Sequence, residues 1–293
     1  MANHQVLLYY KYVHIDDPQA LLQEQRLLCT ELNLTGRLII AHEGINGTLE
    51  GTTENTEKYV TNLLADPRFT DTHMKRSPGT GSSFPRLSIK VRNEIVSGHL
   101  GEKDINPATF TAPHIEAEEL HSWVHSGKEF YIVDMRNDYE HVVGHFANSI
   151  LPPLTNFRDL PAILPSLEHL KDKTVVTVCT GGVRCEKASG FLLSSGFKEV
   201  YQLSGGIVTY MEKYPNEDFH GQLYVFDGRV TMGFNLQDPS HVVVGRCERC
   251  NEPCERYINC ENLDCHRHFI CCESCQAASS PSVCGKNCLA PVY

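Results

Sequence analysis

The feature that most constrains the fold of this chain is a short apolar strand, Thr174 to Val178, which runs directly into Cys179 and then into a helix expected over 186–195. Further strands are expected at 130–134 and 200–203, with helices between the strands. Alternating strands and helices predict a parallel sheet covered by helices on both faces, and such sheets bind ligands at the carboxyl ends of their strands. Cys179 therefore stands where this class of fold carries its sites.

The loop Cys179-Thr180-Gly181-Gly182-Val183-Arg184 has the composition of an anion site that contains a nucleophile. Gly181 and Gly182 allow successive main-chain N–H groups to turn inward, and the amino terminus of the following helix adds a partial positive charge. Both effects lower the pKa of a thiol, and Arg184 adds a permanent positive charge. We therefore expect Cys179 to be largely thiolate at neutral pH. A buried, inert cysteine is the alternative, which the glycine pair and the arginine disfavour.

Cys185 follows this loop directly. It either fills space at the start of the helix or resolves a persulfide or sulfenic acid on Cys179 as a disulfide. The sequence slightly favours the first interpretation.

The first hundred residues are expected to run strand, helix, strand, strand, helix, strand. Asp17 and Pro18 are a favourable cap and first residue for a helix that extends to Leu32. This order predicts a split βαβ, ferredoxin-like (acylphosphatase-like) module. The strands are expected at 6–13, 38–41, 48–50 and 88–92.

A basic stretch lies within this module, between His73 and Asn93, and contains no aspartate or glutamate. It is either a solvated strand and loop or a surface that contacts RNA phosphates, since lysine and arginine supply most sequence-independent affinity for nucleic acids. The candidate RNA-binding residues are Lys75, Arg76, Arg86, Lys90 and Arg92.

The end of the chain is rich in cysteine, because ten of the thirteen cysteines lie between Cys247 and Cys288. In a reducing compartment, such pairs indicate metal ligation, since one turn of chain places two thiolates on the same side of an ion. Structural zinc is favoured; an iron–sulfur cluster and thiols that only pack together are the alternatives. The spacing does not decide which pairs share an ion. The candidate ligands are Cys247, Cys250, Cys260, Cys265, Cys272, Cys275, Cys284 and Cys288.

These patterns divide the chain into three parts. They are the ferredoxin-like module (1–106), with a candidate role in RNA binding, the parallel-sheet α/β core (107–220), and a hairpin with a Cys-rich, zinc-binding tail (221–293). The expected fold class is therefore α/β and α+β, multidomain.

Composition and the start of the chain bear on where the protein works. The longest apolar runs have five or six residues, against the roughly 20 that a membrane span needs. The first residues also lack a basic segment followed by an apolar one, so we expect a cytoplasmic protein without a membrane partner. The net charge of -10 argues against indiscriminate nucleic-acid binding but is compatible with a local basic surface.

The loop at Cys179 resembles that of the rhodanese family. Asp134-Met135-Arg136, Glu140 and Gly144-His145 are similar to that family's first-strand and Gly-His signature. Four residues separate Cys179 from Arg184, one fewer than is usual in cysteine phosphatases, which suits a sulfur-sized substituent. The resemblance implies a rhodanese-type core and a persulfide on Cys179.

A closer resemblance covers essentially the whole chain. Glu43-Gly44-Ile45-Asn46-Gly47, Lys90 to Val96, Cys179 to Ala188 and the terminal cysteines are similar to the bacterial tRNA wobble-uridine hydroxylases. Membership of that family implies an oxidoreductase that converts the anticodon wobble uridine of tRNA to 5-hydroxyuridine, with molecular oxygen as co-substrate and the loop cysteine essential.

Three alternatives of other kinds remain at this point. They are a sulfurtransferase or persulfide carrier acting on a small thiophilic acceptor, a non-catalytic RNA-binding module, and a redox sensor built on Cys179 and Cys185. No organic cofactor is expected, because the sequence has neither a Gly-x-Gly-x-x-Gly fingerprint nor a recognisable two-His-one-carboxylate spacing.

Overall fold

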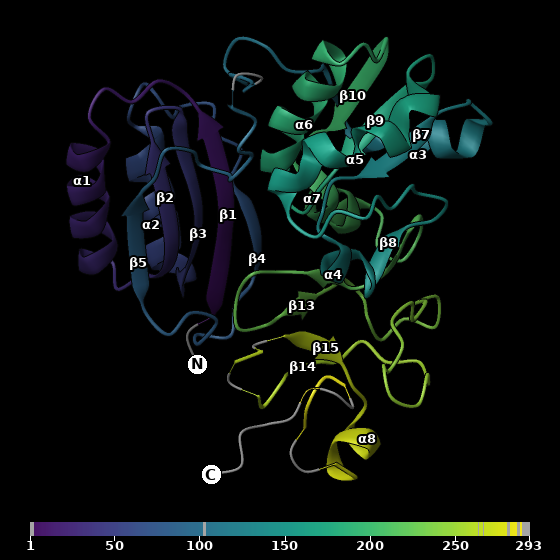
Figure 1. The fold of residues 1–293 in the computed structure, drawn as a ribbon. Helices are drawn as coiled ribbons and strands as arrows, with labels where there is room; N and C mark the ends of the chain where they lie inside the picture. The colour runs from purple at the N-terminus through teal and green to yellow at the C-terminus, as the bar shows by residue number, and fades with distance from the viewer. Residues whose placement is uncertain are drawn as a thin grey trace.

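The computed structural model describes residues 3–101, 104–262, 264–265, 267–279, 282–285 and 288. A five-stranded sheet at the amino terminus lies beside a four-stranded sheet, and the cysteine-rich segment lies below both in Figure 1. The expected α/β and α+β multidomain architecture is confirmed. None of the helices in this described part of the chain combines the length and the apolar character that crossing a bilayer requires.

The amino-terminal module is built on one sheet in the order β4-β1-β3-β2-β5. Its neighbouring strands are antiparallel except for β2 and β5, which are parallel. Asp17 caps the first helix, because its carboxylate accepts hydrogen bonds from two main-chain N–H groups of the first turn. The elements are β1 (His4–Tyr12), α1 (Pro18–Glu31), β2 (Thr35–Ala41), β3 (Gly44–Thr52), α2 (Thr53–Leu64), β4 (Lys75–Pro78) and β5 (Leu87–Val91).

The two faces of this sheet differ in what covers them. Side chains alternate between the faces of a strand, so Leu7 and Tyr9 of β1 pack in the core with α1 and α2. Leu8 and Tyr10 point to the opposite face, which both helices leave open. That open face is turned toward the loop at Cys179 in the second domain, as the pocket described below shows.

The second domain has a parallel sheet in the order β6-β10-β9-β7. Strand β9 lies inside the sheet, and four of its five residues are buried, as expected for a strand covered on both faces. The elements are β6 (His114–Ile115), α3 (Ala117–Ser126), β7 (Tyr131–Asp134), α4 (Asp138–His141), β8 (Gly144–Phe146), η2 (Phe157–Asp159), α5 (Leu160–Leu167), η3 (Glu168–Leu170), β9 (Thr174–Val178), α6 (Val183–Ser194), β10 (Glu199–Leu203) and α7 (Gly206–Lys213).

Short strands connect this domain to the cysteine-rich segment. Strand β11 pairs with β8 of the parallel-sheet domain, and β12 and β13 form the hairpin that the sequence predicts, with Leu223 opposite Met232. A second antiparallel pair, β14 and β15, precedes a short helix. The elements are β11 (Phe219–Gly221), β12 (Leu223–Tyr224), β13 (Thr231–Met232), β14 (Tyr257–Asn259), β15 (His268–Ile270) and α8 (Glu273–Ala277).

Three local expectations are wrong. Strand β3 begins at Gly44, four residues before the strand expected at 48–50, so Gly44 to Gly47 already lie inside it. The basic stretch contains an additional strand, β4, which is short and polar, as edge strands commonly are. Helix α6 begins at Val183 rather than Glu186, because Gly182 adopts a positive φ of 101° and caps the helix immediately after the loop.

Candidate active site and cysteine clusters

The loop at Cys179 is held between the amino termini of α6 and α7. The N–H of Ile207 donates to the carbonyl of Cys179 at 2.9 Å, and the N–H of Val208 donates to the carbonyl of Thr180 at 3.1 Å. Helix α7 approaches this closely because Gly206 has no side chain. A Cβ at that position would lie 2.7 Å from the carbonyl oxygen of Cys179.

The thiol of Cys179 is buried and surrounded by hydrogen-bond donors. The N–H of Gly182 donates to its Sγ at 3.2 Å. Burial alone would raise the pKa of this thiol, but a hydrogen bond from Cys185, the positive charge of Arg184 and main-chain N–H groups of the loop lower it to about 6. Cys179 is therefore mostly thiolate at neutral pH.

Cys185 has the opposite character. Its side chain is fully buried, and both burial and the neighbouring thiolate raise its pKa well above the usual value. Cys185 therefore remains a thiol that donates to Cys179. This arrangement assigns it a supporting role in the resting protein, and a later disulfide with Cys179 stays a prediction.

Arg184 is less available to a substrate than the sequence predicts. Its guanidinium forms two hydrogen bonds with the buried carboxylate of Glu140, at 2.5 and 2.8 Å, and a third with Thr180 at 3.3 Å. A bidentate pair of this kind fixes both side chains. Arg184 thus acts on the thiolate through its charge and its position in the loop, and Glu140 is a site residue that the sequence analysis did not assign.

The residues of the rhodanese-like signature on either side of Glu140 have a structural role. Arg136 and Asp134 form a fully buried ion pair, and Arg136 also donates to the carbonyl of Gly144 at 2.7 Å. His145 is bound through its Nδ1 to the carbonyl of His141 at 2.9 Å. These contacts hold the chain that carries Glu140 and do not reach Cys179.

A pocket of about 330 Å³ lies directly above the loop, between the two domains. Its volume is at the small end of the range typical of ligand sites, roughly 300–1,000 Å³. One wall is the Cys179 loop, and the other is the open face of the amino-terminal sheet. The residues from outside the loop are Leu8, Tyr10, Arg37, Ile39, Asn46, Thr48, Val96 and Phe226.

A second cavity, of about 580 Å³, lies on the other side of Tyr10 and contains more polar groups. The hydroxyl of Tyr10 donates to Glu186 at 2.9 Å, and His114 lies 3.0 Å from the same carboxylate oxygen. Burial alone would raise the pKa of Glu186, but these hydrogen bonds and one from Gln202 lower it. Tyr10 therefore lies between the two cavities, and its hydrogen bond to Glu186 holds it to helix α6.

The five candidate RNA-binding residues do not share one environment. Lys75 is buried with its ammonium 5.0 Å from the ring centre of Tyr10, and burial lowers its pKa to about 8. Arg76 points to the helical face and pairs with Glu57 at 2.7 Å. Arg86, Lys90 and Arg92 are exposed on or beside β5.

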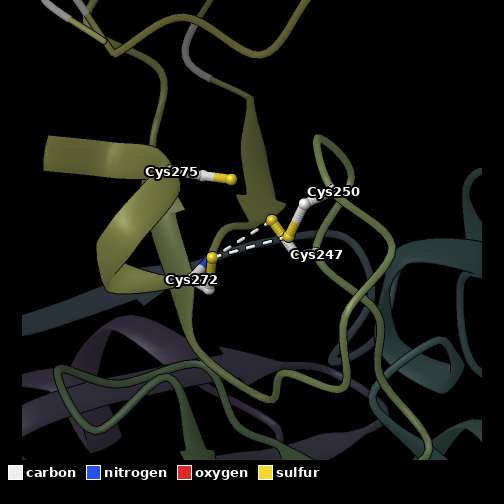
Figure 2. A group of neighbouring side chains, drawn as sticks. All are labelled: Cys247, Cys250, Cys272 and Cys275. Atoms are coloured by element: carbon white, nitrogen blue, oxygen red, sulfur yellow. Dashed lines mark hydrogen bonds between the residues drawn. The ribbon is translucent and has the colours of Figure 1, made fainter. Parts of the chain in front are cut away.

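The structure divides the eight candidate metal ligands into two groups of four. In each group, every sulfur lies within 4.8 Å of the other three. The first cysteine cluster is Cys247, Cys250, Cys272 and Cys275, shown in Figure 2, where the chain before β14 supplies two residues and the chain at α8 supplies two. The second cysteine cluster is Cys260, Cys265, Cys284 and Cys288.

The spacing of these sulfur atoms suits a tetrahedral ion. Zn–S bonds of about 2.3 Å place the sulfurs of a tetrahedral site roughly 3.8 Å apart. The sulfurs of Cys250 and Cys272 are 3.7 Å apart, and two pairs in the second cysteine cluster are 3.5 Å apart. Both clusters could therefore hold a metal ion. The sequence left the pairing open, and in the structure it is interleaved. The first and third cysteine pairs along the chain form one cluster, and the second and fourth pairs form the other.

Comparison with known proteins covers all three parts of the chain. Residues 4–95 match the UPF0176 acylphosphatase like domain, residues 116–213 the Rhodanese-like domain, and residues 220–289 the Rhodanase C-terminal domain. A tRNA uridine(34) hydroxylase of Cytophaga hutchinsonii is 43% identical over 98% of this chain and 90% of its own length. The chain belongs to the tRNA uridine(34) hydroxylase family. Relatives with the same name in Bacillus licheniformis and Bacillus pumilus are 42% and 44% identical over 92% of this chain and 84% of their own lengths.

Three of the four motifs by which the sequence resembles this family meet around Lys187, the residue after Glu186. Its ammonium is fully buried and lies 3.0 Å from Glu43, 3.0 Å from Glu94 and 3.1 Å from Asp104. Glu43 also accepts the N–H of Ile95 at 2.7 Å. One lysine of the rhodanese-like domain thus binds three carboxylates outside it, which fixes the sheet face against the Cys179 loop.

Proposed function

We propose that this protein is a tRNA-modifying oxidoreductase that converts the anticodon wobble uridine to 5-hydroxyuridine, using molecular oxygen as co-substrate and Cys179 as the reactive group. The main support is the thiolate of Cys179, whose pKa is lowered to about 6 and which lies at the base of a pocket between two domains. Near-full-length identity to proteins named tRNA uridine(34) hydroxylase supports the substrate and the reaction.

The chemistry follows from the environment of the thiolate. Cys179 adds to C6 of the uracil ring, so that a C–S bond forms and the C5–C6 electron pair moves toward C5. Oxygen delivers one atom to the electron-rich C5 and the other leaves as water, with two electrons supplied by a thiol reductant. Loss of the C5 proton then expels the thiolate and restores the double bond. A persulfide on Cys179 would perform the same addition through its outer sulfur.

The wobble base must leave its stack to reach this pocket. Bases of an anticodon loop are single-stranded, so unstacking costs less than in a duplex.

Arg37 and Ile39 line the pocket, and Ile39 pairs in register with Lys90 on β5. Exposed Arg86, Lys90 and Arg92 thus continue the same sheet toward solvent, where they are suited to contact tRNA phosphates.

We also propose that the two cysteine clusters are structural zinc sites. Four thiolates at tetrahedral spacing leave no open coordination position, which is the arrangement of structural rather than catalytic zinc. Zinc would supply stability to a segment that has few other elements of its own. A tRNA substrate also supports a cytoplasmic location, which we propose with it.

The sulfurtransferase alternative is not favoured. It needs neither the sheet wall of the pocket nor the tail, whereas the relatives named as hydroxylases match this chain across both.

The test is mass spectrometry of tRNA nucleosides from cells that lack the protein and are complemented with variants. Wild type restores 5-hydroxyuridine and its derivatives, and Cys179→Ser does not, because the nucleophile is lost. Cys29→Ala is the matched control, since Cys29 is a buried cysteine of the amino-terminal core. Normal nucleoside levels with Cys179→Ser would refute the proposal.

A further inference from the structure

A further group of potential metal ligands lies on the parallel-sheet domain. It consists of His121 and His125 on α3 and Glu217 and Asp218 in the segment between α7 and β11. We call these four residues the His-carboxylate group. None of them lines the pocket above Cys179, and none belongs to the two cysteine clusters.

The four side chains converge as metal ligands do. One ligand atom from each lies within 4.8 Å of those of the other three. His121 Nε2 is 2.8 Å from Glu217 and 4.0 Å from Asp218, and His125 Nε2 is 3.2 Å from Asp218. Bonds of about 2.0–2.1 Å in a tetrahedral site place N and O ligands roughly 3.3 Å apart, a value that these distances bracket.

Sequence and packing both direct the two histidines toward one point. They are four residues apart on a helix and therefore share a face, with ring centres 4.4 Å apart. The ring of His121 is stacked on Tyr214 at 3.9 Å, with an interplanar angle of 7°. This stacking fixes the orientation of the imidazole.

Asp218 is also held in place by contacts outside the group. The hydroxyl of buried Tyr210 donates to Asp218, and the carbonyl of Asp218 accepts the N–H of Ala147 at 2.8 Å. Hydrogen bonds to ligating carboxylates are a regular feature of metal sites, because they set the geometry of the ligand. Strand pairing of β11 with β8 holds the same segment in place.

The charge of the group suits a divalent cation. Within the described residues, Glu217 and Asp218 lie within 4.0 Å of these two histidines and form no ion pair with a lysine or arginine. As metal ligands, two carboxylates and two neutral imidazoles would together contribute a charge of minus two. Imidazole favours zinc, iron and nickel over magnesium and calcium, which prefer oxygen ligands alone.

We propose that the His-carboxylate group binds one divalent first-row transition-metal ion, such as Zn²⁺. The ion would join α3 to the segment after α7 and so stabilise the parallel-sheet domain. The sequence analysis found no such arrangement because the two histidines and the two carboxylates are about 90 residues apart in the chain.

The test uses the full chain carrying only two Zn²⁺ per chain, one for each cysteine cluster, titrated with Co²⁺ and followed by visible absorption. We expect one additional Co²⁺ per chain, with d–d bands and no thiolate-to-cobalt charge-transfer band. His125→Ala should weaken this binding at least about tenfold, since losing a ligand costs no less than losing its supporting contact. His125 is 55% exposed, so its replacement leaves the fold intact.

His169→Ala is the matched control, because His169 is exposed and lies outside the group. Glu217→Gln gives a second, independent loss of a ligand, and zinc should raise the unfolding temperature of wild type more than that of either ligand variant. No uptake of Co²⁺ by wild type, uptake only with a charge-transfer band, or equal affinity in His125→Ala would overturn the proposal. None of these readouts depends on hydroxylation.

Discussion

At the scale of single residues, the reactivity of Cys179 is set by opposing effects on one thiol. Burial favours the protonated form, whereas the N–H of Gly182, the thiol of Cys185 and the charge of Arg184 favour the thiolate. The groups that favour the thiolate outweigh burial, because several of them converge on one sulfur. Glu140 moderates this balance, because its carboxylate partly neutralises Arg184.

The pKa of Cys179 can be read from its alkylation rate. We expect the rate with iodoacetamide, followed by peptide mass spectrometry, to rise with pH to a plateau with a midpoint of about 6, since only the thiolate reacts. Cys29 is the internal control, because burial raises its pKa to about 12 and it should remain unmodified across this range. A midpoint near 9 for Cys179 would contradict the account of the loop.

Substitutions of the two partners of the buried ion pair, Glu140 and Arg184, should shift the alkylation midpoint of Cys179 in opposite directions. Glu140→Gln removes a negative charge and should lower the pKa of Cys179, whereas Arg184→Gln removes a positive charge and should raise it. Each variant should also lose about 3–5 kcal/mol of stability, because it leaves a buried charge without its partner. Denaturant unfolding measures the second effect. Shifts in the same direction would show that the charge of Arg184 does not control the thiolate.

At the scale of secondary structure, the loop depends on the glycine that caps helix α6. Gly182 has a φ of 101°, and a Cβ there would lie 2.8 Å from the hydroxyl of Tyr10. We expect Gly182→Ala to cost about 1–3 kcal/mol and to slow alkylation of Cys179 by displacing the N–H that binds the sulfur.

Gly127→Ala is the control for Gly182→Ala, because it introduces backbone strain at a site away from the Cys179 loop. Gly127 also has a positive φ, of 76°, but a Cβ there meets nothing within 4 Å. It should cost roughly 1–2 kcal/mol without any change in alkylation. If both substitutions left Cys179 equally reactive, the close contact with Tyr10 would have no part in shaping the loop.

The sequence predicts those parts of the site that are local in the chain. The strand, the glycine pair and the helix around Cys179 follow from consecutive residues, and the eight cysteines follow from their spacing. Glu140 and Tyr10 could not be assigned, because they reach the loop from 40 residues or more away. The burial of Lys75 was missed for the same reason: only the fold places this edge strand against a neighbouring domain.

At the scale of the whole molecule, the pocket exists because two domains keep a fixed orientation. Tyr10 reaches from the amino-terminal sheet to Glu186, and Lys187 binds the carboxylates of Glu43, Glu94 and Asp104. Neighbouring residues of α6 therefore connect both domains directly beside the Cys179 loop. A substrate base would be enclosed only while these contacts persist.

Lys187→Met should uncouple the domains. It removes a fully buried cation and leaves three carboxylates without it, so we expect a loss of about 3–5 kcal/mol and two separate unfolding transitions by calorimetry. Lys198→Met is the matched control, because Lys198 pairs with Asp172 at the surface, where ion pairs contribute little to stability. One cooperative transition at an unchanged temperature in Lys187→Met would exclude this role.

The most direct test of the central claim is to trap the enzyme on its substrate. In tRNA that carries 5-fluorouridine at the wobble position, a thiolate can add to C6, but fluorine cannot leave as the C5 proton does. We predict a covalent protein–tRNA adduct that peptide mapping assigns to Cys179, and none with Cys179→Ser. An adduct on another residue, or no adduct with a wild-type enzyme that hydroxylates normal tRNA, would contradict the account.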